Sequence, residues 1–240
     1  AARTADCLLH ADAGAPAEAA AAAALARWPH RFEIRARLAL ARALLDQPAA
    51  EGLALLREPD EDAGYYDVAQ AIEVGRELLK RKQPAAARPW LEYAWQRDPW
   101  NSEAASALAE ALHRIEGGDS AAALLRSAIE RNPDNPLLWE DLAVQYCLLG
   151  NWKIATDCFR KSEEIAPSRY ERLLKWAKAM MRLRQYSRAL KPIRAYLAAM
   201  PDDPEGLALL ADIQKRYPAQ TEPPEEDAPK EKSARKFPWE

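Results

Sequence analysis

The side chains best suited to metal binding or acid–base catalysis are three histidines, His10, His30 and His113. An imidazole titrates near neutral pH and ligates metals readily, but a helical metal site needs two of them at a spacing such as HxxxH or HExxH. No two histidines here have that spacing, and no glycine-rich phosphate loop accompanies them. The sequence therefore predicts no metal site and no catalytic histidine.

The three cysteines are the next candidates for chemistry, as nucleophiles, redox pairs or zinc ligands. Cys7, Cys147 and Cys158 form no CxxC pair and are odd in number, which argues against a zinc knuckle or a disulfide framework. We expect Cys147 and Cys158 to be small, partly buried packing residues in a reducing compartment. The chain is accordingly predicted to be no enzyme and to need no cofactor.

Charge and composition exclude further classes. A net charge of −3 and a pI near 5.8 argue against a nucleic-acid partner, because such binding depends on neutralising phosphates. The longest uncharged stretch near the N-terminus, residues 19–26, is far shorter than the ~20 residues of a membrane-spanning helix. About one residue in five is alanine and only 8 are glycine, which favours an all-α fold.

Compartment and origin rest on weaker signals. No signal-peptide core is visible, so we expect a cytoplasmic protein, with the periplasm as the alternative. The excess of arginine over lysine and the heavy use of alanine indicate a GC-rich bacterial genome. Because no methionine precedes Ala1, the sequence is expected to be cut from a longer chain.

A repeat of 34 residues supplies the elements that must position any functional side chain. Pro99, Pro133, Pro167 and Pro201 stand in step at this spacing. In the same register, small residues recur at Gly75, Ala109, Ala143, Ala177 and Ala211, and large apolar residues recur between them at helical spacing. Small residues at fixed intervals indicate places where two helices cross closely.

Caps and turns divide each repeat into two helices. Asn101, Asn135, Asp203 and Ser168 are predicted to cap the first helices, with Pro136 and Pro204 at the first helical position. Glycines at 117–118 and 150, and the segment 82–84, are predicted to turn between first and second helices. Such short helices are marginal alone, so each pair must pack on the next.

These residues resemble the tetratricopeptide repeat. The match is most complete from Leu138-Trp139 through Gly150-Asn151-Trp152 to Pro167, and the resemblance is specific over residues 68–217. It implies a right-handed superhelical solenoid of antiparallel helix pairs. We expect five to six repeats and a capping helix over residues 204–217.

The resemblance weakens towards the N-terminus, which gives three predicted regions. Residues 1–67 would hold a truncated repeat, with a helix over 16–27, and a degenerate one, with helices over 34–46 and 49–57. Residues 68–217 would hold the regular repeats and the capping helix. Residues 218–240 form a proline-rich, charged tail that buries too little apolar surface to fold alone.

The family resemblance also implies a binding groove, because the first helices of such repeats line its concave face. Transferred by position, the candidate groove residues are Ile72, Arg76, Lys80, Glu103, His113, Leu137, Glu140, Val144, Leu148, Leu174, Lys178 and Arg182. We expect Leu137, Val144, Leu148 and Leu174 to anchor apolar side chains. We expect Arg76, Lys80, Lys178 and Arg182 to meet acidic groups of the partner.

The aromatic residues divide into packing and exposed candidates. Trp95, Trp139, Trp152 and Trp176 occupy packing columns of the repeat, whereas Trp90 and Trp100 are not assigned by the register. In the tail, Phe237 and Trp239 form either a solvated terminus or a short motif that anchors in a groove.

The predicted function is a non-catalytic scaffold that binds a peptide or segment of another protein, without nucleic acid or membrane insertion. Two alternatives remain open. The chain could be a regulatory or substrate-recruiting domain of a larger enzyme, or an assembly protein that self-associates through its tail or its N-terminal edge.

Overall fold

The computed structural model describes residues 14–28, 32–57, 66–167 and 169–218, and in these ranges the chain forms twelve helices and no strand. They fall into two compact units, residues 1–149 and 150–240. The helices of unit 1 are α2 (Gly14–Arg27), α3 (Phe32–Leu44), α4 (Ala49–Arg57), α5 (Tyr66–Lys80), α6 (Pro84–Arg97), α7 (Ser102–Ile115), α8 (Gly118–Arg131) and α9 (Pro136–Leu148). Those of unit 2 are α10 (Trp152–Ile165), α11 (Tyr170–Arg182), α12 (Tyr186–Ala199) and α13 (Pro204–Arg216).

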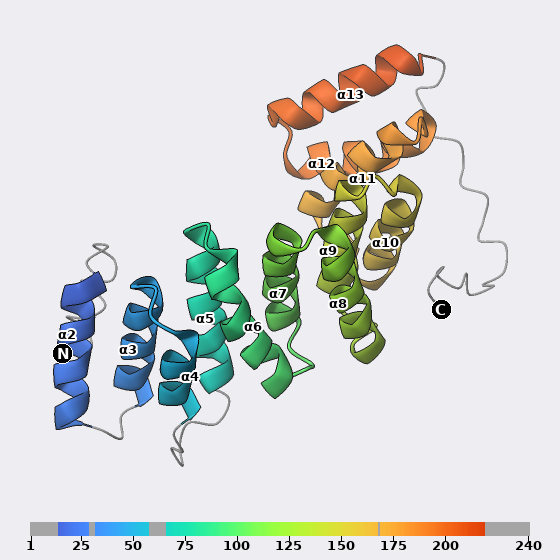
Figure 1. The fold of residues 1–240 in the computed structure, drawn as a ribbon. Helices are drawn as coiled ribbons and strands as arrows, with labels where there is room; N and C mark the ends of the chain where they lie inside the picture. The colour runs from blue at the N-terminus through green and yellow to red at the C-terminus, as the bar shows by residue number, and fades with distance from the viewer. Residues whose placement is uncertain (1–13, 29–31, 58–65, 168, 219–240) are drawn as a thin grey trace. The chain divides into compact units, whose positions relative to one another are not determined.

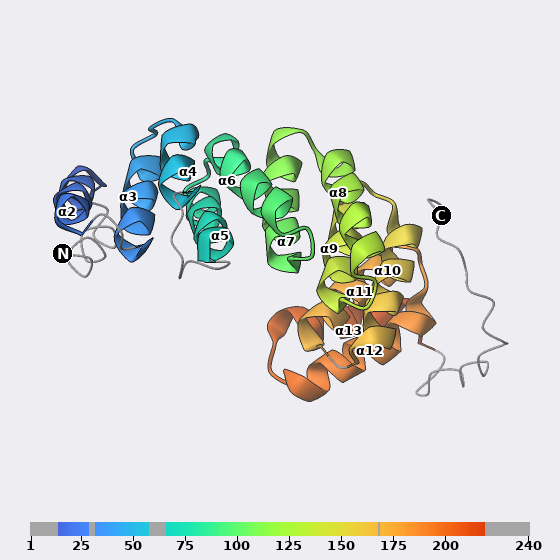
Figure 2. The ribbon, with the colours of Figure 1, turned by 90° about the horizontal axis from the view of Figure 1, so that it is seen from below.

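Within each unit every helix packs against the next one in the chain, as the predicted helix pairs require. Figures 1 and 2 show this succession from α2 to α9 in unit 1. The first helices of successive pairs also touch one another, α3 on α5, α5 on α7 and α7 on α9, and α11 touches α13 in unit 2. The predicted all-α class of stacked antiparallel helix pairs is confirmed.

Three of the four predicted caps are present. The side chain of Asn101 accepts a hydrogen bond from the amide of Ala104 at 3.0 Å, and Asn135 accepts one from Leu137 at 3.0 Å. Asp203 accepts one from Gly206 at 2.7 Å. Ser168 lies outside the described residues. Each cap satisfies an amide that has no partner within its helix.

The turns between first and second helices use left-handed backbone. Gly117 has φ 101° and Gly150 has φ 76°, a conformation that glycine adopts without strain. Non-glycine residues hold the same conformation at Asp46, Lys82 and Arg184, with φ between 57° and 62°. The glycine turns were predicted from sequence, whereas the turn at Arg184 carries no glycine signal.

The small-residue column marks close helix crossings, as expected. A Cβ atom on Gly75 would lie 2.5 Å from Cγ of Leu91, so α5 and α6 can approach this closely only with glycine there. Ala109, Ala143 and Ala177 of the same column are buried. Trp90, which the register left unassigned, is buried against Gly52, whose added Cβ would lie 2.4 Å from Cη2 of the indole.

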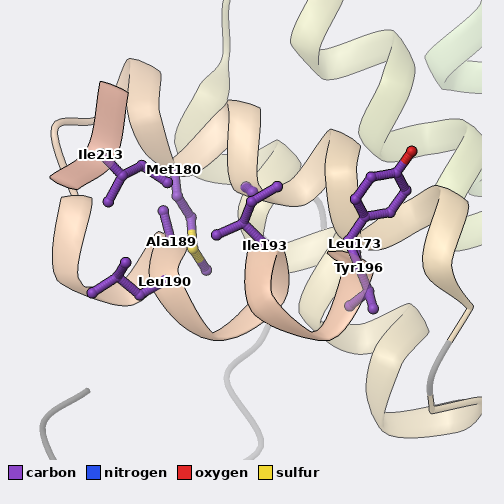
Figure 3. Close-up of a cluster of buried hydrophobic side chains, with 8 residues drawn as sticks. Leu173, Met180, Ala189, Leu190, Ile193, Tyr196 and Ile213 are labelled. Carbon is purple, nitrogen blue, oxygen red and sulfur yellow. The ribbon is translucent and has the colours of Figure 1, made fainter. Parts of the chain in front are cut away.

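Unit 2 has its own apolar core. Leu173 and Met180 from α11, Leu190, Ile193 and Tyr196 from α12, and Ile213 from α13 form one buried cluster with two alanines. Figure 3 shows Ile213, Met180, Ala189 and Leu190 gathered at one end of this cluster, with Leu173 and Tyr196 at the other. Burial raises the pKa of the Tyr196 hydroxyl, and its hydrogen bond to Asp203 adds to this rise.

The last helix is packed on one side only. Ile213 of α13 is fully buried, which confirms a capping helix close to the predicted 204–217. On its other side Leu207 is 47% exposed and Ala211 is exposed, although the equivalent Leu173 and Ala177 of α11 are buried. Leu207 differs from Leu173, one repeat earlier, because no described helix follows α13 to cover it.

Element boundaries agree with the sequence reading to within about two residues, the usual scatter of helix ends. The helix expected over 34–46 is α3, and that expected over 49–57 is α4. The predicted three-region division remains a prediction. The boundary between the two compact units falls between α9 and α10, the two helices of the most complete repeat.

Candidate functional site

The first helices of unit 1 form a continuous surface, here called the first-helix face, which consists of the outward side chains of α5, α7 and α9. Three contacts hold these helices in register. Arg76 of α5 pairs with Glu103 of α7, and the Ser106 hydroxyl of α7 donates to the Asp141 carboxylate of α9. Arg114 of α7 donates to the carbonyl of Leu79 on α5 at 2.8 Å.

The α9 part of this face is apolar. Leu137 is 41% exposed, Leu148 is 60% exposed and Val144 is half-buried between them. Positions 137, 144 and 148 are seven and four residues apart, so they lie along one side of the helix. The helix is apolar on its inner side too, where Leu138, Trp139 and Leu142 are buried. A partner that buried these outer leucines would remove apolar surface from water, which favours binding.

A shallow basic hollow lies at the C-terminal ends of α5 and α7. Its walls are Leu79, Lys80, Lys82, Pro84 and Arg114. Lys80 is 75% exposed and pairs with Glu77 at 3.3 Å, and Arg114 pairs with Glu110 at 2.5 Å. Three cationic side chains thus surround an apolar floor, an arrangement that suits a carboxylate.

Two predicted groove residues are not available on this face. Ile72 is 3% exposed and packs inside unit 1, and Glu140 is 5% exposed. The positional transfer from the family assigned them to the groove because it counts along the helix without regard to how neighbouring helices cover each position. Both belong to the helix packing in this chain.

His113 is the predicted site residue with the most unusual surroundings. It lies in the last turn of α7 and is half-buried, and its buried Nδ1 has no hydrogen-bond partner among the described residues. No second histidine or cysteine accompanies it within a metal-binding group. In the described residues no cluster of three or more histidine, cysteine or acidic side chains could hold a metal ion.

The predicted groove residues of unit 2 are engaged within that unit. Leu174 packs against the apolar core cluster, and Lys178 pairs with Glu205 of α13 at 2.6 Å. The guanidinium of Arg182 lies 5.6 Å from the ring centroid of Trp152, within cation–π range. The face of α11 therefore offers a partner less free surface than that of α9.

One feature of the face escaped the sequence reading. Arg76–Glu103 and Lys178–Glu205 are the same contact in two repeats, because each joins residues 27 apart on successive first helices. We call this contact the cross-helix ion pair. Opposite charges recurring at this spacing could have revealed it. The positional transfer instead assigned Arg76 and Lys178 to a partner's acidic groups, whereas each has an internal acidic neighbour.

The remaining predicted residues divide between buried packing and undescribed positions. Trp139 is buried and its indole Nε1 donates to the Pro133 carbonyl at 2.8 Å, while Trp95, Trp152 and Trp176 are half-buried. Cys158 is buried, and Cys147 is half-buried. Phe237 and Trp239 of the tail lie outside the described residues, as do Cys7, His10 and His30. None of the described helices has the length and apolar character needed to cross a bilayer.

Comparison with known proteins agrees with the repeat. The tetratricopeptide repeat family model matches residues 78–139. The Cut9–Hcn1 hetero-tetramer of the APC/C superposes with a TM-score of 0.55 at 12% identity, covering 86% of this chain and 40% of that one. A tetratricopeptide repeat protein from Parabacteroides merdae gives 0.54 at 18% identity, covering 63% of this chain and 60% of its own.

A third solved structure is covered almost completely. YrrB, described as a tetratricopeptide repeat protein with an unusual peptide-binding site, gives a TM-score of 0.54 at 14% identity over 80% of this chain and 98% of its own. At these identities the likeness concerns the fold. The chain spans less than two thirds of the first two structures, and no curated protein sequence matches it.

Proposed function

Since the chain carries tetratricopeptide repeats, we propose that it is a non-catalytic scaffold that binds a segment of another protein on the first-helix face of unit 1. The observation that carries this proposal is the apolar side of α9, where Leu137 and Leu148 are 41% and 60% exposed. Exposed leucines in line on a helix are suited to anchoring apolar side chains of a partner.

The charge distribution supports an acidic partner segment. The basic hollow of Lys80, Lys82 and Arg114 lies at the ends of α5 and α7, and α7 is the first helix that packs directly on α9. Lys82 is exposed. A segment with apolar residues over α9 and a carboxylate over the hollow would satisfy both surfaces. YrrB, a relative in fold, is itself described as having a peptide-binding site.

Peptide selection tests this proposal without knowledge of the native partner. Twelve-residue peptides that bind the full chain are selected from a random library. Their affinities for the wild type, Leu148→Asp and Leu137→Asp are then measured by fluorescence anisotropy. We expect each substitution to weaken binding about tenfold or more, as removal of a central anchor does. The selected peptides should be rich in apolar and acidic residues.

Leu207→Asp is the matched control, because Leu207 is also an exposed leucine on a first helix, in unit 2. It should leave the affinities unchanged. Selected peptides that bind all three variants as tightly as the wild type would contradict binding on α9.

A further inference from the structure

A second surface of unit 1, away from the basic hollow, carries three aromatic side chains, of which two are exposed and one is half-buried. Phe32 is the first residue of α3, Tyr66 is the first residue of α5, and Trp100 comes two residues before α7. We call these three residues the aromatic row. The chain enters α3, α5 and α7 at the same edge of unit 1 (Figure 1).

The packing of successive first helices places the three aromatic residues next to one another in a line. The rings of Phe32 and Tyr66 have centroids 6.2 Å apart and are tilted by 41°, a favourable aromatic contact. Tyr66 and Trp100 are 34 residues apart, one repeat, and their helices α5 and α7 pack directly. The corresponding position before α9 is Asp134, so the aromatic row ends at α7.

Folding does not account for this exposure. Tyr66 is 64% exposed and Trp100 is 65% exposed, the highest values among the large apolar side chains of the described residues. An apolar residue just before a helix cap often packs on the residue one turn inside the helix. For Trp100 that residue is Ala105, whose single methyl group can cover little of an indole, and the cap itself is made by Asn101.

Two carboxylates flank the aromatic row. Glu33 follows Phe32 and is exposed, and the Asp98 carboxylate accepts the backbone amide of Trp100 at 3.2 Å. Nearby cations are already engaged, because Arg97 pairs with Asp67 at 3.3 Å and Arg76 pairs with Glu103. The edge therefore complements a positively charged partner, which is the opposite of the basic hollow.

We propose that the aromatic row binds a basic, proline-rich segment of a partner protein in the polyproline II conformation. Such a helix has three residues per turn and advances ~9 Å per turn, which matches the ~8–10 Å between directly packed helices. One proline face can therefore stack on Tyr66 and the next on Trp100. Basic residues between the prolines meet Glu33 and Asp98, and the preformed helix loses little conformational entropy on binding.

The test uses synthetic peptides and the full chain. A fluorescein-labelled (Pro-Pro-Arg)4 peptide is titrated in an anisotropy assay, beside (Gly-Ser-Arg)4 of equal length and charge and (Pro-Pro-Glu)4 of opposite charge. We expect (Pro-Pro-Arg)4 to bind at least about tenfold more tightly than either control peptide. Trp100→Ala and Tyr66→Ala should each weaken its binding by about tenfold or more, the usual effect of removing an aromatic anchor.

Tyr170→Ala is the matched control variant, since Tyr170 is an exposed aromatic at the start of first helix α11 in unit 2. It should bind (Pro-Pro-Arg)4 like the wild type, and circular dichroism should show all three variants folded. Leu148→Asp should also leave this binding unchanged, which separates the aromatic row from the first-helix face. Equal binding of (Gly-Ser-Arg)4, unchanged binding in Trp100→Ala and Tyr66→Ala, or no binding up to about 1 mM peptide would each overturn the proposal.

Discussion

The crossing of α8 with α9 in unit 1 and that of α10 with α11 in unit 2 place different chemistry at equivalent positions. In unit 1 the positions hold Ala128 and Leu138, both buried. One repeat later they hold Ser162 and Arg172, and both are fully buried. The repeat thus fixes which positions are buried, while leaving open whether apolar or polar side chains fill them.

In unit 2 the buried guanidinium of Arg172 has several acceptors, although its Nε has no hydrogen-bond partner among the described residues. Arg172 of α11 donates to the Ser162 hydroxyl at 2.9 Å and to the carbonyl of Ala166 at 2.6 Å, and it pairs with Glu163. These acceptors belong to the last turn of α10 and its C-cap, where the helix dipole favours a cation. Unit 2 therefore fastens two helices through one guanidinium, whereas unit 1 relies on apolar contact.

Replacing this guanidinium is expected to have the largest effect. Arg172→Ala leaves the Ala166 carbonyl, the buried Ser162 hydroxyl and Glu163 without this donor and should lower the stability of unit 2 by about 3–5 kcal/mol. Hydrogen–deuterium exchange of α10 and α11 amides should accelerate accordingly, with less change in α5 to α8. Arg160→Ala is the control on α10, since its ion pairs with Asp157 and Glu164 are exposed and should contribute less than about 1 kcal/mol.

The triple variant Ser162→Ala, Glu163→Ile and Arg172→Leu transfers the equivalent unit 1 residues, Ala128, Ile129 and Leu138, into unit 2. Because an apolar pair of similar volume often replaces a buried ion pair without loss, we expect most of the stability to return. If the triple variant is as unstable as Arg172→Ala, the two crossings are not interchangeable and the comparison fails.

Helix capping gives a smaller difference between the units. In unit 1 Asn135 caps α9, whereas in unit 2 the N-cap position of α11 is Arg169, whose side chain makes no cap hydrogen bond. Its backbone is extended, with φ −79° and ψ 101°, as a cap requires. Arg169→Asp should stabilise unit 2 by about 1 kcal/mol, and Asn135→Ala should destabilise unit 1 by a similar amount.

Urea unfolding, monitored by hydrogen–deuterium exchange of the amides in each unit, measures both capping effects. An unchanged midpoint for Arg169→Asp would show that the start of α11 is held by other contacts, such as the 3.8 Å approach of Arg169 to Glu171.

The smallest effect is expected from the cross-helix ion pair, which the two units share. Arg76→Gln in unit 1 and Lys178→Gln in unit 2 should each cost about 0.2–1 kcal/mol, because all four side chains are roughly half exposed. Double-mutant cycles with Glu103→Gln and Glu205→Gln isolate the pairwise coupling, which should fall as salt is added. Zero coupling in both units at low salt would mean that the recurring contact adds no stability.

The sequence predicted the fold well because its signals are local and periodic. Proline spacing, the caps at Asn101, Asn135 and Asp203, and the glycine turns each depend on neighbouring residues, and all were found. The burial of Arg172 could not be predicted in this way, because its acceptors are the side chain and carbonyls of the preceding helix. The only sign of it in the sequence is that a charged residue, Arg172, stands one repeat after the apolar Leu138.

The site was predicted less well, since exposure depends on how helices cover one another. Leu137 and Leu148 lie on the surface as expected, but Ile72 and Glu140 do not. The cross-helix ion pair and the aromatic row were both missed, although each recurs at a simple spacing. Both lie outside the apolar stripes of the helices, so the recurrence of packing residues does not reveal them.

The one-sided packing of α13 bears on how unit 2 opens. An inner helix such as α11 is supported by neighbours before and after it, while α13 rests on α11 and α12 alone among the described elements. In an array stabilised by nearest-neighbour contacts, a helix supported from one side detaches more easily than an inner helix supported from both. We therefore expect α13 to detach more readily than α11, and its transient detachment would expose Met180 and Leu190, which share a buried cluster with Ile213, to water.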